Sequence, residues 1–285
     1  MPQKDPPKTS KEDPIKEVPI GGDGQQFTAP SGMVYRIRPM KVKEQNALAD
    51  RAKMRSGVAL SQILDACLLG VDDPGVYAGW GIEDGARLNP LKLLQGDRFH
   101  MLVNLRKISV KDGKNYEIPA TCTECGEKDQ SNAVDLDALT VQELPKASRA
   151  ILESGDNKFA FGLEVAKRTC WFKLATGEDE LKFAKIQHQQ RQKLSSAALR
   201  MRVLEVEGVK GVDLPKWIES EMYTQDAEAL RDYMDQVDCG VDTTIDVACP
   251  SCGETYDFDI PFGDSRFLIP AVGISKRARM RRQRN

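Results

Sequence analysis

Short stretches of alternating apolar and polar residues in this chain are each followed by a segment with helical spacing. Met33–Arg38 alternates and predicts a strand, and the sequence from Lys41 predicts a helix. Apolar residues then recur at helical spacing in Ile63–Leu69 and in Leu91–Ile108. The sequence between these two segments is rich in Gly, Pro and Asp, so we expect a loop there.

The second half of the chain repeats this order. Phe161–Leu174 alternates and predicts strands. A helix is expected over Thr176–Lys193, because Thr is a good N-cap and three acidic residues follow in the first turn. Met201–Val206 and Val209–Val212 flank a glycine and predict a short hairpin. Leu214–Met234 then has the spacing of a helix.

Each half ends in a CxxCG motif that lies between alternating, strand-like segments, within Ile118–Leu136 and Ile245–Ile260. Alternation on both sides of a tight turn is typical of a β-hairpin, and the glycine suits a backbone with φ > 0. The cysteines of the two motifs are Cys122, Cys125, Cys249 and Cys252. A closed structural zinc site needs four ligands, so we expect these four thiolates to hold one Zn²⁺ ion.

The composition narrows the classes of function. The net charge is −2, so no overall field favours nucleic acid or a membrane surface. Only 6% of residues are aromatic, which leaves few rings for stacking on bases. No apolar run is long enough to cross a bilayer, and the first residues lack the apolar region of a signal peptide. We therefore expect a soluble, intracellular protein with reduced thiols, where paired CxxC motifs favour a metal over disulfides.

The fold class that we predict is α+β, with two pseudo-repeated strand–helix lobes joined by a discontinuous zinc ribbon built from the two CxxCG hairpins. The cysteine motifs are 127 residues apart, and the strand-to-helix segments align at an offset near 135. These similar offsets indicate a duplication, and a chance order of elements is the alternative. The predicted organisation is a flexible N-terminal arm, two lobes with one cysteine motif each, and a basic tail, at residues 1–28, 29–140, 141–264 and 265–285.

The other chemically capable residues favour a structural interpretation. Cys67, Cys170 and Cys239 show no pairing pattern and are expected to be core residues or free thiols. His100 and His188 lie on helix-like stretches without a nucleophile motif, and we expect them to be polar surface or half-buried residues. Hydrolase, nucleotide-binding and metalloprotease motifs do not occur, and four thiolates leave zinc no open position, so we predict no enzymatic activity. A thiol redox enzyme is the alternative, although reactive CxxC thiols usually lie at a helix N-terminus.

Six of the last ten residues are basic, namely Lys276, Arg277, Arg279, Arg281, Arg282 and Arg284. Such a run is either a solvated tail or an electrostatic arm. As an arm, it would bind an acidic protein face or a phosphate backbone. Both interpretations stay open at this stage.

Residues Asp232–Pro270 resemble the C-terminal signature of the T-even-type phage baseplate hub and baseplate assembly proteins. The shared features are a helix, a GVDT approach strand, the CPxCG motif and an acidic–apolar strand. Two upstream pieces also fit, a strand with the helix start after it and a VDLxxL segment after the first motif. Their residues are Leu174, Thr176, Gly177, Asp179 and Glu180, and Val134, Asp135, Leu136 and Leu139. The resemblance covers about residues 31–270, and the basic extension after Phe262 and Phe267 departs from it.

The resemblance implies a structural or assembly protein of the contractile-tail baseplate. It implies contacts with other baseplate and tail proteins, in the virion or in the host cytoplasm during assembly, and no small-molecule or membrane partner. The alternative from the residues is a zinc-ribbon nucleic-acid-binding protein. Acidic residues beside both motifs count against nucleic acid outside the basic tail. They are Glu124, Glu127, Glu254, Asp257 and Asp259.

Overall fold

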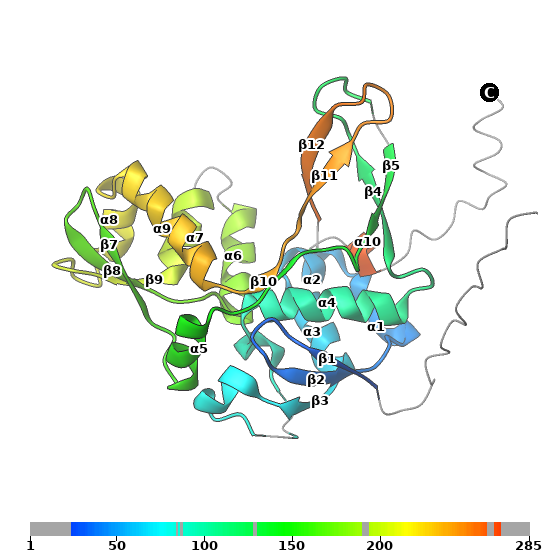
Figure 1. The fold of residues 1–285 in the computed structure, drawn as a ribbon, viewed down its shortest axis with the longest axis horizontal. Helices are drawn as coiled ribbons and strands as arrows, with labels where there is room; N and C mark the ends of the chain where they lie inside the picture. The colour runs from blue at the N-terminus through cyan, green and yellow to red at the C-terminus, as the bar shows by residue number, and fades with distance from the viewer. Residues whose placement is uncertain are drawn as a thin grey trace, which may run out of the picture.

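The computed structural model describes residues 24–83, 85, 88–127, 130–189, 194–260 and 265–268. Within these residues, the chain forms helices and five small sheets in which every strand pair is antiparallel (Figure 1). This confirms the predicted mixture of helices and small sheets. Among the described helices, none combines the length and the apolarity needed to cross a membrane.

The first sheet has the order β1–β2–β3, and its central strand supplies the core. Its strands are β1 (Gln25–Thr28), β2 (Val34–Ile37) and β3 (Leu68–Asp73). The helices between β2 and β3 are α1 (Val42–Leu48), α2 (Arg51–Arg55) and α3 (Val58–Cys67). Tyr35 and Ile37 are buried while their neighbours are partly exposed, because successive side chains of a strand point to opposite faces.

The longest described helix follows the first sheet and leads to the first cysteine hairpin. Before it lie two short 3₁₀ helices, η1 (Gly75–Trp80) and η2 (Pro90–Lys92). The helix is α4 (Gln95–Ser109), and the hairpin strands are β4 (Asn115–Ala120) and β5 (Gln130–Asp135). Met101, Leu102 and Leu105 of α4 are completely buried. In Figure 1, α4 lies between the first sheet and the cysteine hairpins, so it forms the centre of this part of the molecule.

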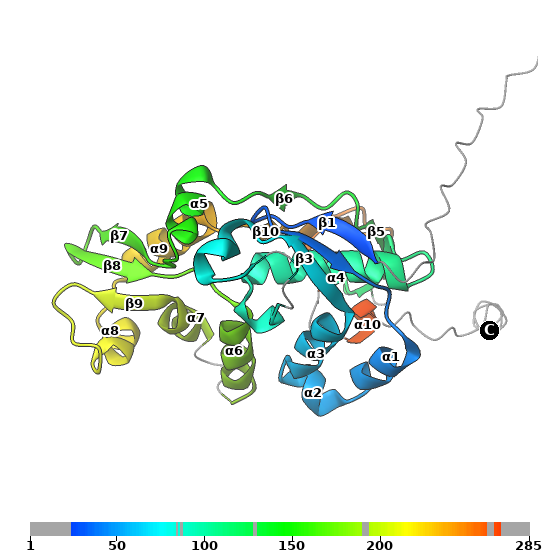
Figure 2. The same ribbon diagram turned by 90° about the horizontal axis from the view of Figure 1, so that it is seen from below.

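The second sheet has the order β7–β8–β9, again with helices between its second and third strands. Its strands are β7 (Phe159–Leu163), β8 (Arg168–Phe172) and β9 (Val203–Val206). The helices between β8 and β9 are α6 (Gly177–Gln189) and α7 (Leu194–Arg202). Then follow α8 (Leu214–Ser220), α9 (Thr224–Val237) and the second cysteine hairpin of β11 (Thr244–Ala248) and β12 (Thr255–Asp259). Figures 1 and 2 both show this sheet, with α8 and α9, at one end of the molecule.

Short elements connect these groups. They are β6 (Val141–Gln142), which pairs with β10 (Gly240–Val241), and the helices α5 (Lys146–Glu153) and α10 (Ser265–Leu268). Between α4 and the start of α6, Leu94 forms a bridge with Thr176, and the Gln95 N–H donates to the Ala175 carbonyl at 2.8 Å. Backbone hydrogen bonds therefore join the two sheet-containing groups directly.

Several predicted elements are confirmed, and others are wrong. The strand after Met33, the helix over Leu91–Ile108 and both cysteine hairpins are present, with small shifts of their bounds. The predicted hairpin at Val209–Val212 is wrong, since that segment forms a turn and β9 pairs with β8 instead. The expected loop after α3 contains β3, and Gln25–Thr28 of the predicted flexible arm forms β1. The rest of that arm, residues 1–23, lies outside the described residues, as does the tail after Leu268.

Candidate metal centre

The first CxxCG motif forms a tight turn that is closed by its own backbone. The N–H of Cys122 donates to the Glu127 carbonyl at 2.9 Å, and the N–H of Gly126 donates to the Cys122 carbonyl at 3.1 Å. Gly126 has φ of 71°, and an added Cβ would meet no atom within 4 Å. Glycine is therefore needed for the left-handed backbone and not for space.

The second CxxCG motif has the same turn. The N–H of Cys249 donates to the Glu254 carbonyl, and the N–H of Gly253 donates to the Cys249 carbonyl, both at 2.8 Å. Gly253 has φ of 78° and is equally free of close neighbours. Two segments far apart in the sequence thus form the same cysteine-presenting turn at the ends of two hairpins.

The four cysteine sulfurs lie together where the two hairpins meet. All of the Sγ atoms of Cys122, Cys125, Cys249 and Cys252 are within 4.8 Å of one another. The Sγ–Sγ distance is 3.8 Å between Cys122 and Cys252 and 3.7 Å between Cys125 and Cys249. A tetrahedron of Zn–S bonds of about 2.3 Å has S···S edges of about 3.8 Å. The arrangement therefore fits a four-coordinate thiophilic ion.

The electrostatics of the cluster favour a bound cation. Cys122 and Cys249 are buried, whereas Cys125 and Cys252 are exposed. The backbone N–H of Glu254 lowers the pKa of Cys252, but the neighbouring sulfurs, Cys249 first, and partial desolvation outweigh it and raise that pKa to about 12. Four thiolates at these distances repel one another, and a divalent cation between them removes that penalty.

The first hairpin is fixed to α4 through Arg106. The Arg106 guanidinium carbon lies 4.9 Å from the ring centroid of Tyr116 in β4 and 5.5 Å from that of Phe267 in α10. Its Nη2 donates to the Asn115 carbonyl at 3.1 Å, and its Nη1 donates to the Phe267 carbonyl. The segment after the second hairpin therefore packs at the base of the first hairpin.

The remaining sulfur-containing candidates are core residues, as expected. Cys67, Cys170 and Cys239 are buried and contribute to the hydrophobic core. Burial raises the pKa of Cys67 to about 11 and that of Cys170 to about 12, so neither thiol is activated.

The structure describes the side chain of one of the two histidines, His100. His100 lies on α4, and its Nδ1 is 3.1 Å from the hydroxyl of buried Tyr35 and 3.3 Å from the Asn104 amide. Burial lowers the pKa of His100 to about 4, so the ring is neutral at physiological pH and takes part in a polar network within the core. The side chain of His188 lies outside the described residues.

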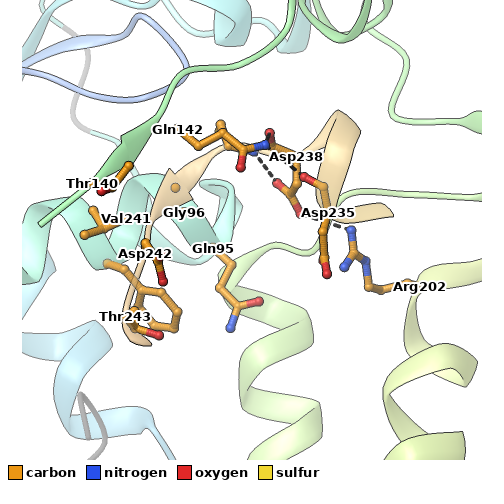
Figure 3. Close-up of a pocket in the computed structure, with 13 residues that line it drawn as sticks. Gln95, Gly96, Thr140, Gln142, Arg202, Asp235, Asp238, Val241, Asp242 and Thr243 are labelled. Atoms are coloured by element: carbon orange, nitrogen blue, oxygen red, sulfur yellow. Dashed lines mark hydrogen bonds and ion pairs between the residues drawn. The ribbon is translucent and has the colours of Figure 1, made fainter. Parts of the chain in front are cut away.

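A pocket of about 470 Å³ lies where α4, β6, β10 and the C-terminal end of α9 meet (Figure 3). Arg202 Nη2 donates to Asp238 Oδ2 at 3.0 Å on its wall. Gln142 Nε2 donates to the carbonyls of Asp235 and Asp238, both at 2.9 Å. Burial raises the pKa of Asp238 to about 6. Cys239 is the one thiol among the residues that line the pocket, and burial raises its pKa as well, so this thiol is not activated.

Comparison with known protein families shows which family the chain belongs to. Residues 23–268 match the family described as T4 bacteriophage base plate protein. The match covers most of the chain and includes both cysteine motifs, so the chain belongs to this family and is a phage baseplate protein. Neither a curated protein nor a solved structure matches the chain.

Proposed function

We propose that the chain is a non-enzymatic structural or assembly protein of a contractile-tail baseplate, in the hub region, and that it acts through contacts with other tail proteins. The observation that carries this proposal is the family match over residues 23–268. The cysteines outside the two motifs are buried, His100 is neutral, and the thiol of Cys239 in the pocket is not activated. These observations support a binding role. Its place of action is then the tail of the virion or, for an assembly factor, the host cytoplasm.

A structural Zn²⁺ ion held by Cys122, Cys125, Cys249 and Cys252 belongs to the same proposal. The all-thiolate donor set and S···S distances of 3.7 and 3.8 Å support zinc over a harder cation. Each hairpin supplies two ligands, so the ion would complete a discontinuous zinc ribbon. Because the ligands come from distant parts of the chain, metal binding would stabilise the whole fold.

We also propose that the two lobes, residues 29–140 and 141–264, are an internal duplication. The first support is a buried carboxylate at the start of α1. Glu44 accepts a hydrogen bond from Arg38 Nη2 at 3.1 Å and one from the backbone N–H of Lys41 at 2.5 Å. This carboxylate therefore links the end of β2 to the first turn of the helix after it.

The start of α6 has the same arrangement. Asp179 is buried, accepts from Lys173 Nζ at 2.7 Å and accepts from the backbone N–H of Thr176 at 3.1 Å. Lys173, Thr176 and Asp179 follow their counterparts by 135 residues each. The counterparts are Arg38, Lys41 and Glu44. A shared offset at three interacting positions is harder to obtain by chance than a shared order of elements.

A second pair of buried carboxylates also matches. Asp97 lies in the first turn of α4 and accepts from the N–H of Ser31 in the β1–β2 turn at 3.0 Å. Asp226 lies in the first turn of α9 and accepts from the N–H groups of Val165 and Ala166 in the β7–β8 turn, both at 2.9 Å. In each half, the helix before the cysteine hairpin thus holds the turn of the first hairpin.

The surface of the cysteine hairpins weighs against the alternative of a zinc-ribbon nucleic-acid-binding protein. The described residues of these hairpins, 115–127, 130–135 and 244–260, contain eight acidic residues and no Lys or Arg. They are Glu117, Glu124, Glu127, Asp135, Asp246, Glu254, Asp257 and Asp259. A surface of this charge repels a phosphate backbone, which leaves nucleic acid only the basic tail.

The test of the proposed function is genetic. Deleting the gene from its phage should leave capsids and DNA replication intact while tails fail to assemble or assemble without a normal baseplate. Normal tails with failed transcription or replication would refute the proposal and favour nucleic-acid binding. Finding the protein in purified virions would then identify a built-in component, whereas its absence would identify an assembly factor.

A further inference from the structure

The pocket beside α4 carries an excess of negative charge. Three aspartates line it, Asp235, Asp238 and Asp242, and Arg202 is the one basic residue among its lining residues. Arg202 pairs with Asp238, whereas neither Asp235 nor Asp242 pairs with a Lys or Arg of the described residues. In Figure 3, side chains from several separate segments surround this space. The pocket is therefore suited to a cationic side chain that the described residues do not supply.

The basic segment Lys276–Arg284 carries the complementary charge, and the chain length allows it to reach the pocket. The described chain ends in α10, whose Phe267 carbonyl accepts a hydrogen bond from Arg106. Arg106 is near the C-terminal end of α4, and the pocket lies at the N-terminal end of α4, at Gly96. Ten residues of α-helix span about 15 Å. The eight residues from Leu268 to Lys276 can span about 26 Å when extended.

The acidic cysteine hairpins offer a competing surface for the basic segment. Their carboxylates, such as Asp246 and Asp257, are exposed, and water and salt screen exposed ion pairs strongly. In the pocket, Asp235 and Asp242 are exposed as well, but Asp238 is only 23% exposed and the three carboxylates line one concave space, so a guanidinium that enters it meets more than one of them. Gln142 also lines the pocket, and its side-chain amide oxygen is an acceptor of the kind that suits the planar, five-donor guanidinium of arginine.

We propose that the pocket between α4, β6, β10 and α9 binds arginine side chains of the chain's own segment Lys276–Arg284. The basic segment would then lie folded back along α4 in the free protein. A baseplate partner that binds the pocket or the basic segment would have to separate the two. This inference rests on the pocket, its charge and the chain length, and not on the proposed baseplate function.

Site-specific photocrosslinking on the full-length chain tests the proposal. Met280 lies between Arg279 and Arg281 and would be replaced by p-benzoylphenylalanine. After irradiation and digestion, mass spectrometry should place the adducts on peptides that contain Gln95–Phe99 or Val241–Thr243. Adducts concentrated on the hairpin strands β4, β5, β11 or β12 would overturn the proposal in favour of the competing surface.

Two charge variants make the result specific. The double variant Asp235→Asn/Asp242→Asn should lower the yield of pocket adducts about fivefold, because it removes the two pocket carboxylates that pair with no Lys or Arg of the described residues. The matched control, Glu228→Gln/Asp232→Asn, removes two exposed charges from α9 outside the pocket and should leave the yield unchanged. Equal yields in both double variants would overturn the proposal.

Mixed isotopes distinguish the chain's own segment from that of a second copy. Equal amounts of unlabelled and ¹⁵N-labelled chains would be combined before irradiation. Adducts that join only peptides of the same label support binding within one chain, whereas mixed-label adducts overturn it. For the chain that carries only the photocrosslinker at position 280, raising the salt to about 0.5 M should reduce the yield of pocket adducts, since screening weakens the ion pairs. Salt-independent adducts would contradict the electrostatic basis.

Discussion

Arg98 of α4 is a fully buried cation whose partners come from three other segments. Its Nε donates to Glu180 Oε2 at 2.9 Å, its Nη1 to the Pro90 carbonyl at 2.8 Å and its Nη2 to Ser61 Oγ at 3.0 Å. Because α4 and α6 belong to different halves, this single guanidinium joins them. Its charge is compensated by Glu180, so the loss of either member of this ion pair leaves the other charge without its counter-ion.

We predict that Arg98→Met lowers the free energy of unfolding by about 3 kcal/mol, because it breaks a buried ion pair and leaves Glu180 and Ser61 without their donor. The control is Arg200→Met, which breaks the pair between Arg200 and Glu219 at 2.7 Å, where the arginine side chain is 39% exposed. That change should cost about 1 kcal/mol or less. Urea unfolding measures both, and equal costs would contradict the role given to Arg98.

Asp238 gives a residue-scale prediction for pH dependence. Burial raises its pKa from 3.8 to about 6, so between these pH values the folded chain retains a proton that the unfolded chain releases. The unfolded state then binds fewer protons, and the free energy of unfolding decreases as pH rises through this window. Asp238→Asn should remove this contribution. Between about pH 4 and about pH 6, the stability of the variant should increase relative to that of the unchanged chain. Parallel pH profiles would contradict the prediction.

At the scale of elements, the contact between α4 and β10 depends on backbone-to-backbone packing at Gly96. A Cβ at this position would clash with the carbonyl of Cys239 and with the Cα of Gly240. Gly96 is within a helix, so its backbone conformation alone would accept any residue. The requirement for glycine is therefore one of space, and it holds the first turn of α4 directly against the strand that leads to the second cysteine hairpin.

Gly96→Ala is predicted to destabilise the protein by about 1–3 kcal/mol through overpacking, although alanine normally favours a helix by about 1 kcal/mol. The expected change in the free energy of unfolding is thus opposite in sign to the change that helix propensity alone would give. Gly211→Ala provides the control, since a Cβ there meets no atom within 4 Å and its φ is not in the left-handed region. Thermal unfolding of both variants measures the difference, and a stabilised Gly96→Ala protein would refute the close approach.

Which elements the sequence predicts depends on how local their stabilising contacts are. The helix α6 was predictable because Thr176 and the acidic residues after it form a start signal within one turn. The strand β1 was missed because its sequence QQFT has one apolar residue, and it exists only through pairing with β2. The strand β3 follows α3 without a break, so its apolar residues read as a continuation of that helix.

At the scale of the whole molecule, the candidate metal centre was predictable and the pocket was not. Four cysteines in two CxxCG motifs identify one another by residue type, so their meeting could be inferred although Cys122 and Cys249 are far apart in the sequence. The pocket combines Gln95, Gln142 and Asp238 with residues from other segments. These are common surface residue types, and only the packing of the two halves brings them together.

The buried carboxylates show how the two halves are built. Within the described residues, the buried acidic side chains are Glu44, Asp97, Asp179 and Asp226. They form two matched pairs, one at a strand-to-helix junction and one between a helix start and a hairpin turn. Burying a carboxylate is costly unless it is hydrogen-bonded, so such groups persist where they determine local geometry. The proposed duplication explains why a buried carboxylate occurs at the same two positions in each half.

The last prediction concerns the metal that would join these halves. Purified protein should contain about one zinc ion per chain, bound to the four cysteines. Cys249→Ser removes one ligand and should lower both the zinc content and the melting temperature of the whole protein, because the two hairpins extend from both halves. Ser251→Ala changes an exposed residue of the same turn and should alter neither quantity. A strong chelator should lower the melting temperature of the unchanged chain but not that of Cys249→Ser. Zinc-free protein with two intact disulfides would refute the metal site, and a chelator-independent melting temperature would refute its structural role.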